Sequence, residues 1–94
     1  MKQDIKKLSK YIHDELNMAE SYLTCAAAKT GDERDLFKVI SRDELNHAEK
    51  LMLLVDSSVN PLATNDPNKI IWEYVKEGFK DRHIKLKANW TMLD

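Results

Sequence analysis

Two glutamates and a histidine stand where the helical pattern around them calls for apolar residues. In the first half of the chain, a seam with alternating spacings of three and four consists of Ile5, Leu8, Ile12, Glu15, Ala19, Tyr22 and Ala26. A second seam with the same spacing consists of Phe37, Ile40, Glu44, His47, Leu51 and Leu54. Glu44 and His47 therefore project from one helix face, one turn apart. Carboxylates within an apolar layer need a neutralising partner, because burying one uncompensated charge costs several kcal/mol.

A divalent cation is the simplest partner for these carboxylates. No lysine or arginine falls on either seam, and carboxylate oxygen and imidazole nitrogen are ligands that iron, manganese and zinc accept. Three ligands are too few for an octahedral ion, but two copies of the chain related by a twofold axis would pool two sets of Glu15, Glu44 and His47. Their four carboxylates would balance two divalent ions. In the alternative interpretation, Glu44 and His47 form a solvent-exposed pair that stabilises the helix by about 0.3 kcal/mol.

The elements that position these residues are predicted to be helices in a single all-α domain over 1–94. An antiparallel hairpin covers about 3–56: the first helix ends at Lys29–Thr30–Gly31, with Gly31 in the left-handed conformation, and Asp32 caps the second helix. Glu15 and His47 each lie about 16 residues from this turn, so the hairpin brings them to the same height. A loop follows at 57–66.

A third helix is expected over about 67–90, because Asp66 followed by Pro67 is typical of a helix start. Its broad apolar face contains Ile71, Trp72, Val75, Phe79, Leu86 and Trp90. We expect this helix to cover the outside of a dimer or to join dimers. His13 and His83 have no carboxylate at metal-ligand spacing and are expected to be surface or structural residues, and Cys25 to be a small apolar packing residue.

The segments YIHDELNMAESY and ISRDELNHAEKL resemble the first and second helices of the ferritin-like superfamily, over roughly residues 3–56. With one Glu-x-x-His motif per chain, the sequence resembles the half-ferritin arrangement within this superfamily, which also includes the rubrerythrins. The resemblance implies a ferritin-like four-helix bundle completed by dimerisation, in a homodimer or a ring of dimers. It also implies two iron ions per dimer, with Glu44 bridging, Glu15 and His47 as terminal ligands, and Tyr22 orienting a carboxylate from outside the ligand set. Manganese and zinc also suit this ligand set.

The activity that the resemblance implies is that of a ferroxidase-like oxidoreductase, which oxidises Fe(II) with dioxygen or peroxide in iron handling or oxidative-stress protection. Glu15, Glu44 and His47 would be its catalytic residues. One alternative is a di-metal site used for peroxide reduction, and another is a non-enzymatic helical interaction module. The C-terminus, KANWTMLD, lacks the linker and apolar tag that direct half-ferritins into encapsulin shells, so no encapsulin partner is expected.

Composition excludes several other classes of protein. The 94 residues contain 15 Lys plus Arg against 16 Asp plus Glu, and this balance is not that of a nucleic-acid binder. No apolar run approaches the roughly 20 residues that cross a bilayer, so no membrane partner is expected. A single cysteine rules out a disulfide framework within the chain and fits the cytoplasm.

Overall fold

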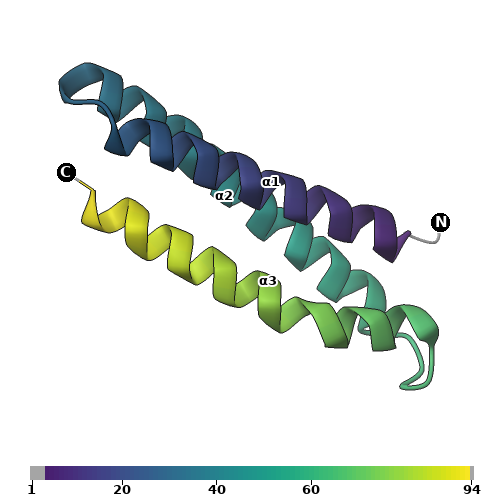
Figure 1. The fold of residues 1–94 in the computed structure, drawn as a ribbon. Helices are drawn as coiled ribbons and strands as arrows, with labels where there is room; N and C mark the ends of the chain where they lie inside the picture. The colour runs from purple at the N-terminus through teal and green to yellow at the C-terminus, as the bar shows by residue number, and fades with distance from the viewer. Residues whose placement is uncertain (1–3, 94) are drawn as a thin grey trace.

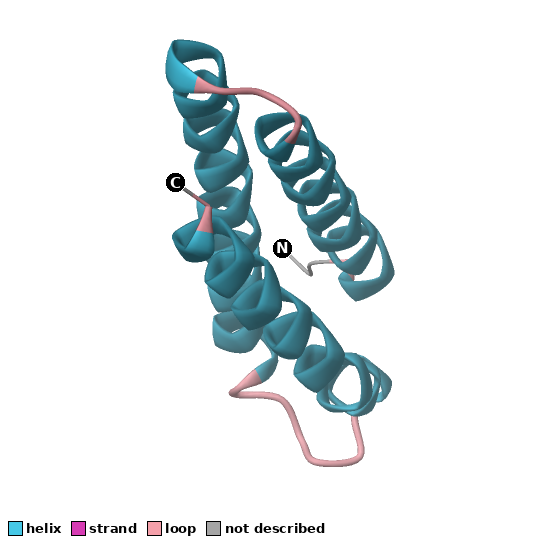
Figure 2. Ribbon diagram, turned by 60° about the vertical axis from the view of Figure 1, so that its left-hand side comes forward, coloured by secondary structure: helices cyan, strands magenta, loops and turns pink. Residues whose placement is uncertain are grey.

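The computed structural model describes residues 4–93, which form three α-helices joined by two short connections (Figure 1). The helices are α1 (Ile5–Ala27), α2 (Gly31–Val59) and α3 (Pro67–Met92). α1 and α2 form an antiparallel hairpin, and α3 returns beside it, antiparallel to α2 (Figures 1 and 2). The bundle measures 50 × 22 × 15 Å. No strand occurs within residues 4–93, so the prediction of an all-α chain with a hairpin and a third helix is confirmed.

The turn between α1 and α2 follows the predicted conformation with different capping residues. Gly31 has a φ of 58°, as expected. The prediction that Asp32 caps α2 is wrong, because α2 begins at Gly31 with Thr30 as its N-cap. Asp32 lies instead in the first turn, where its charge favours the positive end of the helix dipole.

The end of α1 is completed by an arginine from α2. α1 ends at Ala27, two residues before the predicted end at Lys29. The Arg34 Nε donates to the carbonyl of Lys29 at 2.8 Å and to that of Ala26 at 3.1 Å. The Ala26 carbonyl also accepts from the backbone N–H of Lys29 at 3.1 Å, and Arg34 adds a further donor where the helical hydrogen bonds of α1 end.

The second connection is shorter than predicted. α2 continues to Val59, three residues past its expected end at Asp56, because Val59 is buried in the core. α3 begins as predicted: Asp66 is the N-cap, its Oδ1 accepts from the backbone N–H of Asn68 at 2.9 Å, and Pro67 takes the first position. α3 ends at Met92, two residues beyond the predicted end at 90.

The core uses a different stripe of α2 from the predicted seam. The buried residues of α2 are Ser41, Leu45, Ala48, Met52, Val55 and Val59. They pack against the buried face of α1, which is Ile5, Leu8, Ile12, Leu16, Ala19, Leu23 and Ala26, and against Trp72 and Leu86 of α3. Of the apolar residues of the predicted α2 seam, Phe37, Ile40 and Leu51 are half-buried and Leu54 is exposed, while the core lies on the stripe beside it that contains Ala48 and Val55. The reason is that α3 covers one side of the hairpin and shifts the core toward itself.

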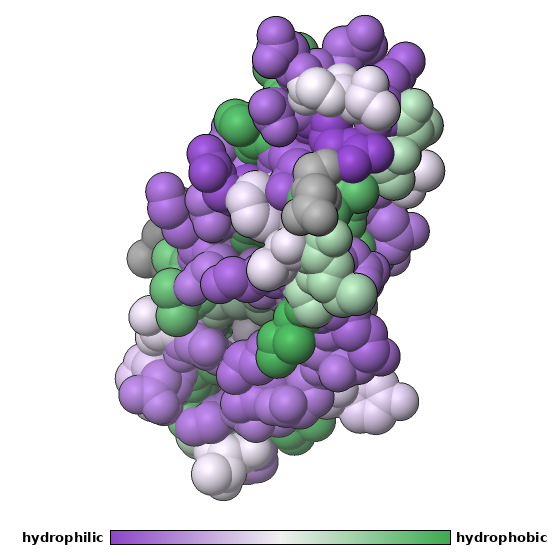
Figure 3. All heavy atoms as spheres, turned by 90° about the vertical axis from the view of Figure 1, so that its left-hand side faces the viewer, coloured by the Kyte–Doolittle hydropathy of each residue, from purple (hydrophilic) through white to green (hydrophobic). Residues whose placement is uncertain are grey.

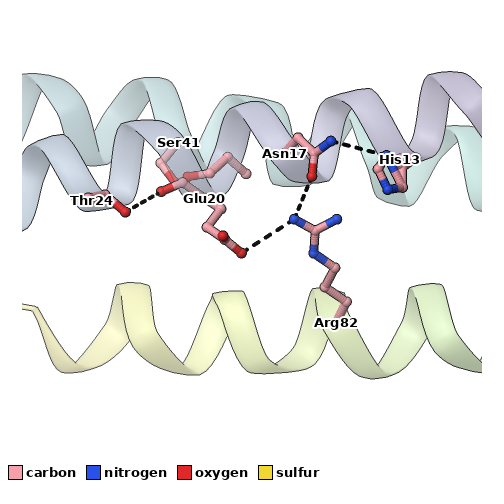
Figure 4. A network of polar contacts seen from close by, with 7 residues as sticks. His13, Asn17, Glu20, Thr24, Ser41 and Arg82 are labelled. Atoms are coloured by element: carbon pink, nitrogen blue, oxygen red, sulfur yellow. Dashed lines mark hydrogen bonds and ion pairs between the residues drawn. The ribbon is translucent and has the colours of Figure 1, made fainter.

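Polar contacts hold α3 against α1 (Figure 4). The Arg82 Nη2 donates to Asn17 Oδ1 at 2.7 Å and lies 3.3 Å from Glu20 Oε2. The other end of the Asn17 amide contacts His13 Nδ1 at 3.1 Å, and His13 is exposed, which agrees with the surface position that was one of its two predicted roles. Between α1 and α2, the buried Ser41 hydroxyl donates to the Ala19 carbonyl at 2.7 Å.

Two indoles of α3 fix it to α2. The Trp72 Nε1 donates to Asp56 Oδ1 at 2.7 Å, and the Trp90 Nε1 donates to the Lys38 carbonyl at 2.7 Å. The Lys38 ammonium in turn lies 4.3 Å from the centre of the Trp90 ring. α3 thus packs on its own hairpin, so any role in joining or covering dimers would fall to its outer surface.

The surface is mixed in character. At the end that carries the α1–α2 turn, hydrophilic residues surround smaller groups of apolar ones (Figure 3). Cys25 is exposed, so its expected packing role is wrong. Within residues 4–93, no helix has the length and apolar character that crossing a membrane requires.

The two glycines provide a matched test of this fold. Gly31→Ala should lower the free energy of unfolding by about 1 to 2 kcal/mol, because φ is positive at this position although the space around it is open. Gly78→Ala should raise it by about 0.5 to 1 kcal/mol, because Gly78 lies inside α3 with nothing within 4 Å of an added Cβ. Urea denaturation measures both, and equal effects would contradict the assigned turn.

Candidate metal centre

The structure brings Glu15, Glu44 and His47 together on the side of the hairpin that α3 leaves uncovered. One ligand atom from each residue lies within 4.8 Å of the others. The His47 Nδ1 is 3.5 Å from Glu15 Oε2 and 3.9 Å from Glu44 Oε1. Glu15 and His47 lie at the same height along the hairpin because Glu15 precedes the short turn by about as many residues as His47 follows it.

Burial differs across the cluster. The side chain of Glu44 is 14% exposed, that of Glu15 is 25% exposed and that of His47 is 54% exposed. The carboxylates thus lie in the seam between α1 and α2, and the imidazole lies at its rim. The Oε2 atom of Glu15 is fully buried and has no hydrogen-bond partner. A buried acceptor without a donor is unfavourable, so this oxygen is suited to a cation.

The electrostatics of the cluster show unsatisfied negative charge. Among residues 4–93, His47 is the only ion-pair partner of either glutamate. A hydrogen bond with Glu15, together with burial and the Glu15 charge, raises the pKa of Glu44 from 4.5 to about 7. His47 opposes this rise only in part. Between pH 4.5 and about 7, the carboxylate pair without a cation therefore holds a proton that an ordinary exposed glutamate would have released.

The geometry of the cluster fits one side of a metal site. Ligand atoms held by one first-row divalent ion at about 2.1 Å lie about 3.0 to 3.5 Å apart, so the distances from His47 Nδ1 to the two carboxylates need to shrink little or not at all. Two oxygens and one nitrogen suit iron, manganese or zinc. They leave the remaining coordination positions to water, substrate or a second chain.

Tyr22 lies two turns along α1 from Glu15, and its ring stacks on Phe37 with the ring centres 6.3 Å apart. Within residues 4–93, neither Glu15 nor Glu44 has a hydrogen bond to Tyr22. The expected role of Tyr22 in orienting a carboxylate stays a prediction. What the structure assigns to Tyr22 is packing beside the cluster.

An apolar surface surrounds the cluster on the uncovered side, which we call the open face. Three of its members belong to the predicted α2 seam and are half-buried: Phe37, Ile40 and Leu51. Four large apolar residues on it are exposed: Tyr11, Met18, Leu36 and Leu54. On α1, helical geometry places Tyr11 and Met18 on a different side from Asn17 and Glu20, which contact α3. The open face therefore combines exposed apolar surface with a polar centre.

Comparison of the chain with known protein families, with curated proteins and with solved structures gives no match. The case for a metal site accordingly rests on the geometry and charge of Glu15, Glu44 and His47.

The raised pKa of Glu44 predicts the pH dependence of stability in metal-free protein. Between pH 4.5 and about 7 the unfolded chain releases the Glu44 proton while the folded chain retains it, so the free energy of unfolding should fall as pH rises. The loss attributable to Glu44 is on the order of 2 kcal/mol. Denaturation in the presence of a chelator measures the free energy of unfolding at each pH. The wild type should show this loss, and Glu44→Gln, which has no titrating carboxyl at position 44, should not. Glu77→Gln, on the outer surface of α3, should retain the wild-type slope, and a Glu44→Gln slope equal to that of the wild type would contradict the assignment.

Proposed function

We propose that two copies of this chain pack through their open faces and that the pooled residues form a di-metal centre that oxidises Fe(II). The observation that carries the proposal is the convergence of Glu15, Glu44 and His47, without a lysine or arginine partner, on an uncovered apolar surface. Packing two open faces together would bury apolar surface and complete the ligand set in one step.

The arrangement of residues along the open face suits a twofold axis through the cluster. On one side of the cluster lie Tyr22 and Phe37, and on the other lie Leu51 and Leu54. A twofold axis perpendicular to the helices reverses this order in the second copy. It therefore sets the aromatic pair of each chain against the two leucines of the other, so that apolar surface covers apolar surface on both sides of the polar centre.

Charge and ligand number support the same assembly. Two copies would supply four carboxylates and two imidazoles, which is the ligand set of a di-metal carboxylate centre. The four negative charges would balance two divalent ions with both histidines neutral. The buried Oε2 atom of Glu15 would gain a cation as its partner, and the proton that Glu44 holds below about pH 7 would be displaced.

In this proposal Fe(II) is the substrate. Two Fe(II) ions each give up one electron to dioxygen, which takes up two protons, so two Fe(III) ions and one hydrogen peroxide result. Glu44 would bridge the two ions and Glu15 and His47 would each bind one. The chain's contribution is to hold both ions at bonding distance from one oxidant and to neutralise their charge. His47, as the most exposed of the three ligands, lies where substrate would arrive.

Metal content tests the proposal directly. Protein loaded anaerobically should bind two Fe(II) per dimer and oxidise them faster than buffer on exposure to air, as measured by absorbance. Glu44→Ala and His47→Ala should each lower Fe(II) affinity by at least tenfold, and Glu77→Ala is the matched control. A separate arm with hydrogen peroxide as oxidant shows whether peroxide is the preferred partner. Less than one iron per dimer would refute the proposal, and stability of both alanine variants within about 1 kcal/mol of the wild type would then favour the interaction module.

The dimer face has its own matched test on α2. Leu54→Asp places a charge on the open face and should shift the native mass from dimer to monomer, at a dimer affinity cost of about 2 kcal/mol or more. Leu53→Asp is the control: Leu53 is more exposed than Leu54, at 58% against 42%, but points 100° away around the helix. Light scattering coupled to size-exclusion chromatography measures the masses. A monomeric wild type, or equal effects of the two substitutions, would contradict the proposed interface.

A further inference from the structure

A groove runs between α2 and α3, on a different side of α2 from the open face. It consists of two adjoining cavities of about 320 and 230 Å³ that share Glu49, His83 and Lys87. Together they reach the size of small-molecule sites, which begin at roughly 300 Å³. Neither cavity includes Glu15, Glu44 or His47, so the groove would stay open when two copies pack through their open faces.

The middle of the groove has a defined structure. The His83 Nε2 lies 3.0 Å from the carbonyl oxygen of Leu45, and because a carbonyl only accepts, this nitrogen carries the proton. The ring is thereby fixed between the two helices. Leu45 and Met52, which are buried, contribute an apolar floor on the α2 side.

The walls of the groove carry cations without partners. Arg42 of α2 and Lys87 of α3 line the smaller cavity, and Lys80 lines the larger one. Within residues 4–93, none of the three has an ion pair or a side-chain hydrogen bond. Two acidic residues line the groove: Asp56 lines only the larger cavity, where it accepts a hydrogen bond from the Trp72 indole, and Glu49 is the one acidic residue that lines the smaller cavity. The net charge around the smaller cavity is thus positive and suits an anion.

Both cavities combine polar and apolar lining, but different residues line each of them. Arg42, Asn46 and Thr91 line only the smaller cavity, together with the apolar side chains of Leu45 and Trp90. Leu53 and Ile84 line only the larger one, which Asp56 and Lys80 also line, and their side chains are 58% and 65% exposed. A ligand that spans both cavities would therefore have a charged head and an apolar tail.

We propose that this groove binds an amphiphilic carboxylate, with its head between Arg42 and Lys87 and its alkyl chain along Leu53 and Ile84. The guanidinium of Arg42 matches the planar, two-oxygen geometry of a carboxylate. Lys87 reaches the same head from the opposite wall. The alkyl chain would cover the two exposed apolar side chains and remove them from water.

Sodium octanoate is the probe for this site, followed by NMR shifts of the Leu53 and Ile84 methyl groups and the Arg42 Nε–H. Saturable shifts at both ends of the groove are expected, with weaker binding of acetate, which lacks the tail, and no shifts at the groove with octylammonium, which reverses the head charge. Arg42→Gln and Lys87→Gln should each weaken octanoate binding about tenfold. Lys50→Gln, on the outward side of α2, should leave the affinity unchanged.

A variant at the tail end separates the two parts of the ligand. Ile84→Asn should weaken octanoate binding several-fold and leave acetate binding unchanged. Octanoate shifts that never saturate, or that spread over the surface without reaching Arg42 and Ile84, would overturn the proposal. Equal affinities for octanoate and acetate, or binding of octylammonium at the same residues, would overturn it as well. All these outcomes are independent of whether the protein binds or oxidises iron.

Discussion

The contact between the Glu15 and Glu44 carboxylates is the constraint around which the functional side of this molecule is arranged. Two carboxylates this close, in a seam mostly shielded from water, are held together only if a proton or a cation lies between them. In the metal-free chain Glu44 can hold this proton, because the neighbouring Glu15 and burial raise its pKa to about 7. A divalent cation would serve better, because it can also satisfy the buried Oε2 of Glu15 and the nearby His47 nitrogen.

The position of α3 determines what this carboxylate pair faces. α3 packs on one side of the α1–α2 hairpin, with Trp72 and Leu86 buried against it. On that side Arg82 contacts α1, and Trp72 and Trp90 donate hydrogen bonds to α2. Within residues 4–93, no fourth helix covers the opposite side of the hairpin. A charged pair beside exposed Met18 and Leu54 is an unfavourable combination for an isolated chain. In the proposed dimer, the same surface of a second chain would cover it.

Much of this arrangement could be predicted from the sequence because it follows from local rules. The positive φ of Gly31, the cap at Asp66 and the height match of Glu15 with His47 each depend on a few residues and on the rise of a helix. The capping of α1 by Arg34 could not be predicted, since it depends on a long side chain reaching across the turn. The choice of core stripe on α2 could not be predicted either. Ser41, Leu45 and Met52 keep the same spacing as the predicted seam, and only the docking of α3 decides between the two.

The apolar run Leu51–Val55 shows why periodicity alone was insufficient for α2. Successive residues of a helix point 100° apart, so Leu53, Leu54 and Val55 enter three environments: the groove beside α3, the open face and the core. A helix with one buried side has no need of three apolar residues in a row. Within the monomer only Val55 of these three is fully buried, while Leu53 and Leu54 are exposed. The apolar residues of α2 therefore exceed those that the packing of α1 and α3 buries within residues 4–93.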